Sequence, residues 1–209
     1  MSLTDIQIRD LAKRMKVPLV FCGFKTELED ESLQYNKSYI VNIEDEFDKD
    51  GERNDGTHYT CFQVNKYPNG KVERIYFDSF GQPPPQIVES FCGGKLPYQT
   101  KDIQSLMNEA CGWYCLAFLH YVNAFEGRTK DLYSDCEHFT DLFDDLNKSC
   151  DHLKNEFVLK HFFQSDDPKK RGPIEVGGSA NPDTIIEHDE DYKKKGGEMF
   201  HIDVETKYV

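Results

Sequence analysis

Apolar positions along the chain divide it into helix-like and strand-like stretches, most of them before residue 164. Residues 4–15 carry apolar side chains at helical spacing, and Thr4 followed by Gln7 is a capping-box pattern. This combination predicts that a helix begins at Thr4. Short apolar or alternating runs predict strands, at residues 19–22, 37–43, 57–64 and 72–77.

The last two of these strands are separated by Tyr67-Pro68-Asn69-Gly70, and Asn-Gly is the strongest short hairpin signal. Folding about this turn places residue 58 opposite roughly residues 79–81, so His58 and Asp78 lie at the same end of neighbouring strands. Cross-strand neighbours and diagonals are about 5–8 Å apart, a distance at which an imidazole and a carboxylate can meet. The pattern leaves open whether the two side chains share a face of the sheet.

The most apolar stretch, residues 111–125, is hydrophobic nearly all round. This is typical of a helix enclosed in a core, and we expect a sheet to pack against it. Amphipathic periodicity then predicts two further helices, over about residues 132–146 and 151–163.

The composition changes at Ser165 to charge, glycine and proline. We therefore expect a domain over residues 1–164 and a C-terminal extension over residues 165–209 that is ordered against it. Alternating residues near the end, 202–206, are compatible with one more edge strand.

Composition limits the kind of protein further. With 209 residues and 38% hydrophobic content, the chain is long enough for one domain with a substantial core. No apolar run approaches the roughly 20 residues of a membrane span, and the polar start does not resemble a secretory signal. Seven scattered cysteines predict neither a disulfide framework nor a zinc site, and they favour a reducing compartment. The net charge of −13 argues against a nucleic-acid-binding protein.

Candidate chemistry begins at Cys111, where a polar loop gives way to the long apolar helix. The N-terminus of a helix favours negative charge, so a cysteine there is available as a thiolate near neutral pH. The alternative is an ordinary buried core cysteine. We keep that interpretation for Cys115, one turn further along, and interpret Cys111 as a nucleophile.

Three further residues complete this chemistry. His58 could take the thiol proton and later deliver a proton to a leaving amine. Asp78 could orient the imidazole, with Asp102 as a weaker rival. Gln104 could donate its amide to an oxyanion, beside the backbone N–H of Cys111. Taken singly, these residues would be a strand histidine, a turn aspartate and a solvated glutamine, but together they indicate a cysteine protease.

Three pieces of the chain carry a family resemblance: Gly56-Thr57-His58-Tyr59, Phe77-Asp78-Ser79-Phe80-Gly81, and residues 104–120. They resemble the adenain-like cysteine proteases, the family of the adenovirus maturation protease and of similar enzymes in virophages and Maverick/Polinton elements. The last piece is the most specific, because Gln104 stands seven residues before Cys111-Gly112.

The resemblance implies an α+β, papain-related fold, in which a central helix bearing the nucleophile packs on a mixed, mainly antiparallel sheet. It implies a triad of His58, Asp78 and Cys111 with Gln104 as oxyanion donor, and neither a cofactor nor a metal. The implied activity is endopeptidase cleavage of capsid or core precursor proteins after small residues, often Gly-Gly, during virion maturation. The implied location is the virion and the virus factory in the host-cell cytoplasm, with no membrane partner.

The resemblance also raises the question of an activator. The adenovirus protease is activated by a viral peptide and by DNA, so the resemblance implies an activating viral peptide here, whereas the net charge of −13 argues against activation by DNA. Two alternative functions stay open. One is a SUMO- or ubiquitin-like protein protease of the same fold, which also accepts Gly-Gly. The other, from a different class, is a catalytically idle virion structural protein, which would not need all four residues together.

Overall fold

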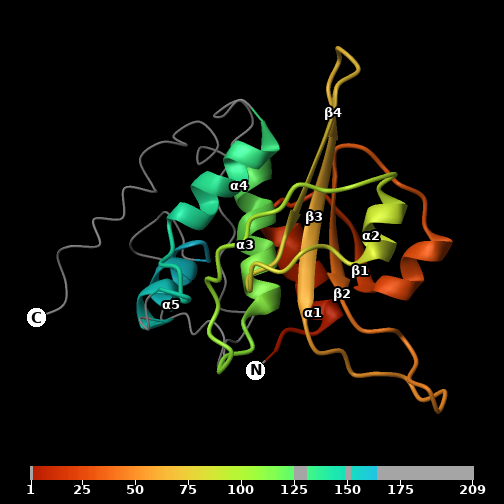
Figure 1. Cartoon of the computed structure of the whole chain (residues 1–209), viewed down its shortest axis with the longest axis horizontal. Coiled ribbons are helices and arrows are strands. Elements are labelled where there is room, and N and C mark those ends of the chain that lie inside the picture. Colours follow the sequence, from red (N-terminus) through yellow and green to blue (C-terminus); the bar gives the residue numbers. More distant parts are fainter. Residues whose placement is uncertain (1, 125–130, 149–151, 164–209) are drawn as a thin grey trace, which may run out of the picture.

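A four-stranded mixed sheet with helices on both faces forms the body of the molecule (Figure 1). The computed structural model describes residues 2–124, 131–148 and 152–163. The strands lie across the sheet in chain order: β1 (Leu19–Phe24), β2 (Lys37–Asn42), β3 (Tyr59–Lys66) and β4 (Val72–Phe77). β1 is parallel to β2, whereas the other two pairings are antiparallel. The prediction of an α+β protein with a mixed, mainly antiparallel sheet is confirmed.

Alternate side chains of the strands enter two separate cores, because successive residues of a strand point to opposite faces. In β3, Cys61 belongs to one core and its neighbour Phe62 to the other. The larger core is covered by α1 (Asp5–Arg14), α3 (Cys111–Ala124), α4 (Leu132–Asp141) and α5 (His152–His161). The smaller core is covered by the 3₁₀ helix η1 (Lys25–Asp30) and by α2 (Gln86–Phe91).

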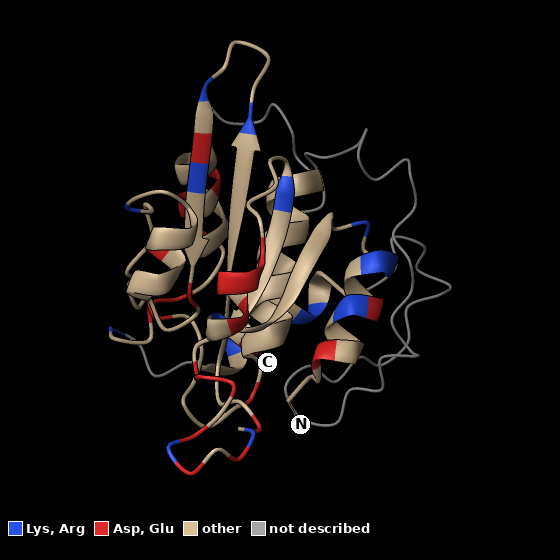
Figure 2. Ribbon diagram, turned by 90° about the vertical axis from the view of Figure 1, so that its right-hand side faces the viewer, with Lys and Arg blue, Asp and Glu red and all other residues tan. Residues whose placement is uncertain are grey.

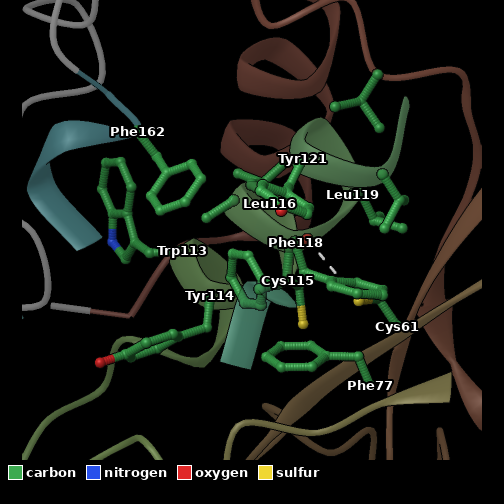
Figure 3. Packing of buried hydrophobic residues seen from close by; sticks show 14 of the residues in the cluster. Cys61, Phe77, Trp113, Tyr114, Cys115, Leu116, Phe118, Leu119, Tyr121 and Phe162 are labelled. Atoms are coloured by element: carbon green, nitrogen blue, oxygen red, sulfur yellow. Dashed lines mark hydrogen bonds between the residues drawn. The ribbon is translucent and has the colours of Figure 1, made fainter. Parts of the chain in front are cut away.

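α3 is buried along nearly its whole length, as its apolar sequence predicts. On its sheet side, the ring of Phe77 stacks on Phe118 with 4.6 Å between ring centroids. On its other side, Trp113 meets Phe163 edge to face at 4.8 Å. Figure 3 shows this enclosure, with Phe77 and Phe162 on opposite sides of the helix. A helix packed on both sides holds its first residue in a fixed place.

α1 begins at the predicted capping box. Thr4 Oγ1 accepts a hydrogen bond from Gln7 N at 3.3 Å, and Gln7 Oε1 accepts one from Thr4 N at 2.9 Å. The helix packs closely against the start of α3, because a Cβ at Gly112 would lie only 3.2 Å from Ile8 Cδ1. Glycine at this position therefore allows the N-terminus of α3 to approach α1.

Several element boundaries differ from those that the sequence pattern predicts. β1 is longer than predicted and leads directly into η1, which the pattern did not indicate. The helix predicted over residues 132–146 ends at Asp141, because the backbone N–H of Asp144 donates to Asn155 Oδ1 at 2.7 Å and leaves the helical pattern. The extension over residues 165–209, with its edge strand at 202–206, lies outside the described residues and stays a prediction.

Within the described ranges, no helix is both long enough and apolar enough to cross a membrane. The most apolar helix, α3, has 14 residues.

Candidate active site

Cys111 is the first residue of α3. The first N–H groups of a helix have no acceptor within the helix, and together with the dipole they give this position a partial positive charge. The backbone N–H of Tyr59, the first residue of β3, donates to Cys111 Sγ at 3.4 Å. The sulfur therefore lies between the N-terminus of the helix and the start of a strand, at a residue only 4% exposed.

His58 and Asp78 meet at the same end of the sheet. The distance from His58 Nε2 to Asp78 Oδ1 is 3.0 Å, and both residues are buried. Because a carboxylate can only accept, Nε2 carries the proton of this bond. The other ring nitrogen, Nδ1, is left for the thiol of Cys111, which lies close enough to His58 to raise the pKa of the imidazole. The structure thus brings base, acid and thiol together at this end of the sheet.

The pKa of His58 reflects two opposing effects. Burial lowers it, but the hydrogen bonds to Asp78 and Cys111 and the charges of these groups raise it more, to about 9 from the ordinary 6.5. An imidazolium beside Cys111 is therefore favoured at neutral pH, and an imidazolium is the partner that a thiolate requires.

The hairpin register explains how the histidine is held. The last paired residues are Cys61 and Phe77, so His58 lies just before the paired part of β3 and Phe80 lies in the turn after β4. Their rings lie 4.7 Å apart with an interplanar angle of 30°. The backbone N–H of Phe80 donates to Asp78 Oδ1 at 2.7 Å. Phe80 therefore covers the imidazole and also fixes the carboxylate that orients it.

Gln104 is also buried, and it is linked to the Asp78 turn by a hydrogen bond from Ser79. Its Oε1 accepts a hydrogen bond from Ser79 Oγ at 2.7 Å, and its Nε2 donates to the carbonyl oxygen of Asn108 at 3.0 Å. An amide nitrogen has two hydrogens, so one remains for a further acceptor. His58 has Asp78 as its partner and not the rival acid Asp102, whose carboxyl pKa is raised by burial.

The side chain of Asn108 holds the loop between Gln104 and Cys111 in place. Asn108 Oδ1 accepts from the backbone N–H of Ala110 at 3.2 Å, and Asn108 Nδ2 donates to Glu156 of α5 at 2.9 Å. At its tip, Leu106 and Met107 are 83% and 93% exposed. The loop therefore holds two apolar side chains in solvent, a few residues before the candidate nucleophile.

The other cysteines of the described ranges lie in different surroundings. Burial raises the pKa of Cys22 and of Cys92 to about 12. Burial also raises the pKa of the remaining three, Cys61, Cys115 and Cys136. These five thiols are therefore held neutral, and the interpretation of Cys115 as a core cysteine agrees with its full burial.

Among the residues that the structure describes, no group of three or more His, Cys, Asp and Glu could hold a metal ion. No protein-family model matches the chain, and no curated protein sequence matches it. The chemistry of the site is therefore interpreted from its own geometry.

Three contributors to the site are not apparent from the sequence pattern. Phe80 covers His58, Ser79 binds Gln104, and Asn108 supplies the carbonyl oxygen that holds the Gln104 amide. The Asn-Gly hairpin could have indicated Phe80, since it brings residues 79–81 near His58. An asparagine shortly before a helix is a capping signal, so Asn108 could also have been noticed. No local pattern pairs Ser79 with a glutamine 25 residues away.

Proposed function

We propose that this protein is a cysteine endopeptidase, in which Cys111 is the nucleophile, His58 the base and Asp78 the orienting acid. The observation that carries the proposal is the position of three groups: His58 Nε2 lies 3.0 Å from Asp78 Oδ1, and the backbone N–H of the next residue, Tyr59, donates to Cys111 Sγ at the start of α3 at 3.4 Å. A nucleophile bonded to a base, which is in turn oriented by a third group, is the arrangement that covalent catalysis requires.

The acylation step follows from these positions. The Cys111 thiolate attacks the carbonyl carbon of the scissile peptide bond, and the carbonyl oxygen becomes an oxyanion. That oxyanion accepts from the backbone N–H of Cys111 and from the second hydrogen of Gln104 Nε2. As the C–N bond breaks, the imidazolium of His58 gives its proton to the leaving amine, and a thioester remains on Cys111.

Deacylation reverses these roles. His58, now neutral, takes a proton from a water molecule, and the resulting hydroxide attacks the thioester carbonyl. The C–S bond breaks, a carboxylic acid product leaves, and Cys111 and His58 return to the thiolate–imidazolium pair. Asp78 holds the same ring orientation throughout, because its bond to Nε2 leaves Nδ1 free for both transfers.

A catalytically idle structural protein is supported less well. A buried ion pair is weak support for stability, because desolvation offsets much of its attraction. Here the pair also touches a thiol at a helix N-terminus, beside a loop with two exposed apolar side chains. A structural role requires none of these features together, whereas a substrate chain needs an accessible surface beside the nucleophile.

We further propose that the enzyme is an adenain-like maturation protease, acting on capsid or core precursors after small residues in the virion and the virus factory. Three features support this: the short motifs around His58, Asp78 and Cys111, the order of these residues along the chain, and their placement. The nucleophile stands on a buried helix, and base and acid stand on the sheet packed against it.

The test combines thiol labelling with peptide cleavage. At about pH 6.5, iodoacetamide should modify Cys111 well before the five buried cysteines, as peptide mapping by mass spectrometry would show. Cys111→Ala and His58→Ala should each lose at least about a thousandfold of the turnover of an extended peptide with a Gly-Gly step. Cys92→Ala, in the core on the opposite face, is the matched control and should keep full turnover. Equal labelling of all cysteines, or cleavage by Cys111→Ala, would contradict the proposal.

A further inference from the structure

Ser79 stands between the acid and the oxyanion donor, and it has no assigned role in the mechanism above. It follows Asp78 in the chain, is fully buried, and donates its hydroxyl to Gln104 Oε1 at 2.7 Å. Its carbonyl oxygen also accepts from the backbone N–H groups of Ile103 at 2.9 Å and of Gln104 at 3.2 Å. Ser79 therefore binds both the backbone and the side chain of Gln104.

These contacts fix which end of the Gln104 amide faces which partner. The carbonyl oxygen of Asn108 can only accept, so the atom 3.0 Å from it must be Nε2. The Ser79 hydroxyl then meets Oε1, and it can satisfy this oxygen only by donating. With both ends assigned, one amide hydrogen is taken by Asn108 and the other is left for the oxyanion.

On the basis of the proposed protease mechanism, we infer that Ser79 is a positioning residue that holds the Gln104 amide ready for the oxyanion. A free glutamine side chain has several rotatable bonds, and ordering it costs up to about 2 kcal/mol. The Ser79 bond orders it before substrate arrives. Without that bond the amide must be ordered in the transition state, where the oxyanion forms, so turnover falls while substrate binding changes little.

Ser79→Ala should lower kcat by roughly 2- to 12-fold, which is the effect of losing one neutral hydrogen bond. KM should stay within about twofold. A peptide aldehyde, which forms an oxyanion-bearing adduct with the thiol, should bind more weakly by the same factor, roughly 2- to 12-fold. Alkylation of Cys111 by iodoacetamide should be unchanged, because attack at a saturated carbon forms no oxyanion. This last readout separates the role of Ser79 from damage to its neighbour Asp78.

Ser38→Ala is the matched control. Ser38 is also fully buried, and its hydroxyl donates to a glutamine, Gln63 Oε1, at 2.6 Å. This pair lies where β2 begins, next to Asn123 in the last turn of α3, and so at the opposite end of that helix from Cys111. The variant Ser38→Ala should lower the melting temperature about as much as Ser79→Ala does, but it should leave kcat and aldehyde affinity unchanged.

A double-variant experiment decides the inference. If Ser79 acts through Gln104, the variant Ser79→Ala/Gln104→Ala should turn over as slowly as Gln104→Ala and no slower. Multiplicative losses, or a Ser79→Ala enzyme with wild-type kcat and aldehyde affinity, would overturn the positioning role and leave the protease proposal intact. If the wild-type protein shows no cleavage that depends on Cys111, the proposed function itself fails, and the role of Ser79 fails with it.

Discussion

The ring of His58 is where burial and electrostatics oppose each other most directly. Burial alone would favour the neutral imidazole, because it withdraws the ring from water. Asp78, 3.0 Å from Nε2, and the thiol of Cys111 favour the protonated ring, and together they outweigh that effect. The protonated form is therefore the stable one in the folded protein at neutral pH.

The variant Asp78→Asn tests this balance through the pH dependence of activity. In the wild type, kcat/KM should fall as the pH rises through about 9, where His58 loses the proton that the leaving amine needs. The pKa of His58 is higher in the folded than in the unfolded protein. The stability that this shift contributes is therefore fully present below about pH 6.5, and it is lost as the pH rises through about 9.

Asparagine at position 78 keeps the size of the side chain but removes its charge, while burial still lowers the pKa of His58. The basic limb of the profile should therefore move to lower pH by at least about one unit. A profile measured with a neutral peptide over the basic range, for both proteins, gives the comparison. An unmoved basic limb in Asp78→Asn would contradict the assignment of Asp78.

Residues with strong local signals could be located from sequence, and residues that act through distant contacts could not. Cys111 marks the change from polar loop to apolar helix, and an Asn-Gly turn places His58 near Asp78. Whether these two share a face depends on the pairing register, which the five-residue loop between Lys66 and Val72 sets. Ser79 gives no local signal, because its partner is brought to it by the path of the loop after α2.

At the scale of elements, the turn after β4 carries the acid. The backbone N–H of Gly81 donates to the carbonyl oxygen of Asp78 at 2.9 Å, and this hydrogen bond closes the turn that begins at Asp78. Gly81 has φ +68°, and a Cβ there would lie 2.4 Å from the carbonyl oxygen of Thr100. The neighbouring loop therefore approaches the turn as closely as a glycine permits.

Gly81→Ala should lower both stability and activity. The left-handed backbone costs roughly 1–2 kcal/mol for an L-residue, and contact with the Thr100 backbone adds to it, since that neighbour cannot rotate away. Asp78 then moves with the turn. Gly70→Ala is the matched control, because Gly70 has φ +83° with nothing within 4 Å of its Cβ, at the hairpin tip. Urea unfolding and kcat should show that Gly70→Ala loses stability alone, and equal activity in the two variants would contradict this account.

The sheet and its central helix could be predicted at this scale, because each depends on short-range patterns. Alternating apolar and polar residues predict β3 and β4. Residues 111–125 would be apolar on every face of a helix, and this predicts that α3 is enclosed in the core. The end of α4 could not be predicted, since it depends on the side chain of Asn155, which donates to the carbonyl oxygens of Ile103 and Asp144. Such a contact joins three segments that are separate in sequence.

At the scale of the whole molecule, negative charge gathers at the end that holds the candidate site. The loop of residues 44–55 contains seven carboxylate residues and two basic ones (Figure 2). After three further residues the chain enters β3 at Tyr59, so this loop leads into the candidate site. A polar cavity of about 370 Å³ opens beside Tyr59, and three carboxylates and two guanidinium groups line it. With a net charge of −13, we expect this field to repel DNA and to attract cationic chains.

Two peptides that share a Gly-Gly step but carry flanking Lys or flanking Glu residues should therefore be cleaved at different rates. At low salt the Lys-flanked peptide should show the higher kcat/KM, by roughly tenfold, because charge steering raises encounter rates by about 10- to 1,000-fold. In about 1 M salt the Debye length falls to about 3 Å, so the two rates should converge. Duplex DNA added at low salt should leave peptide turnover unchanged, since its binding needs a basic surface. A faster Glu-flanked peptide, or activation by DNA, would show that a local basic site outweighs the charge of the molecule.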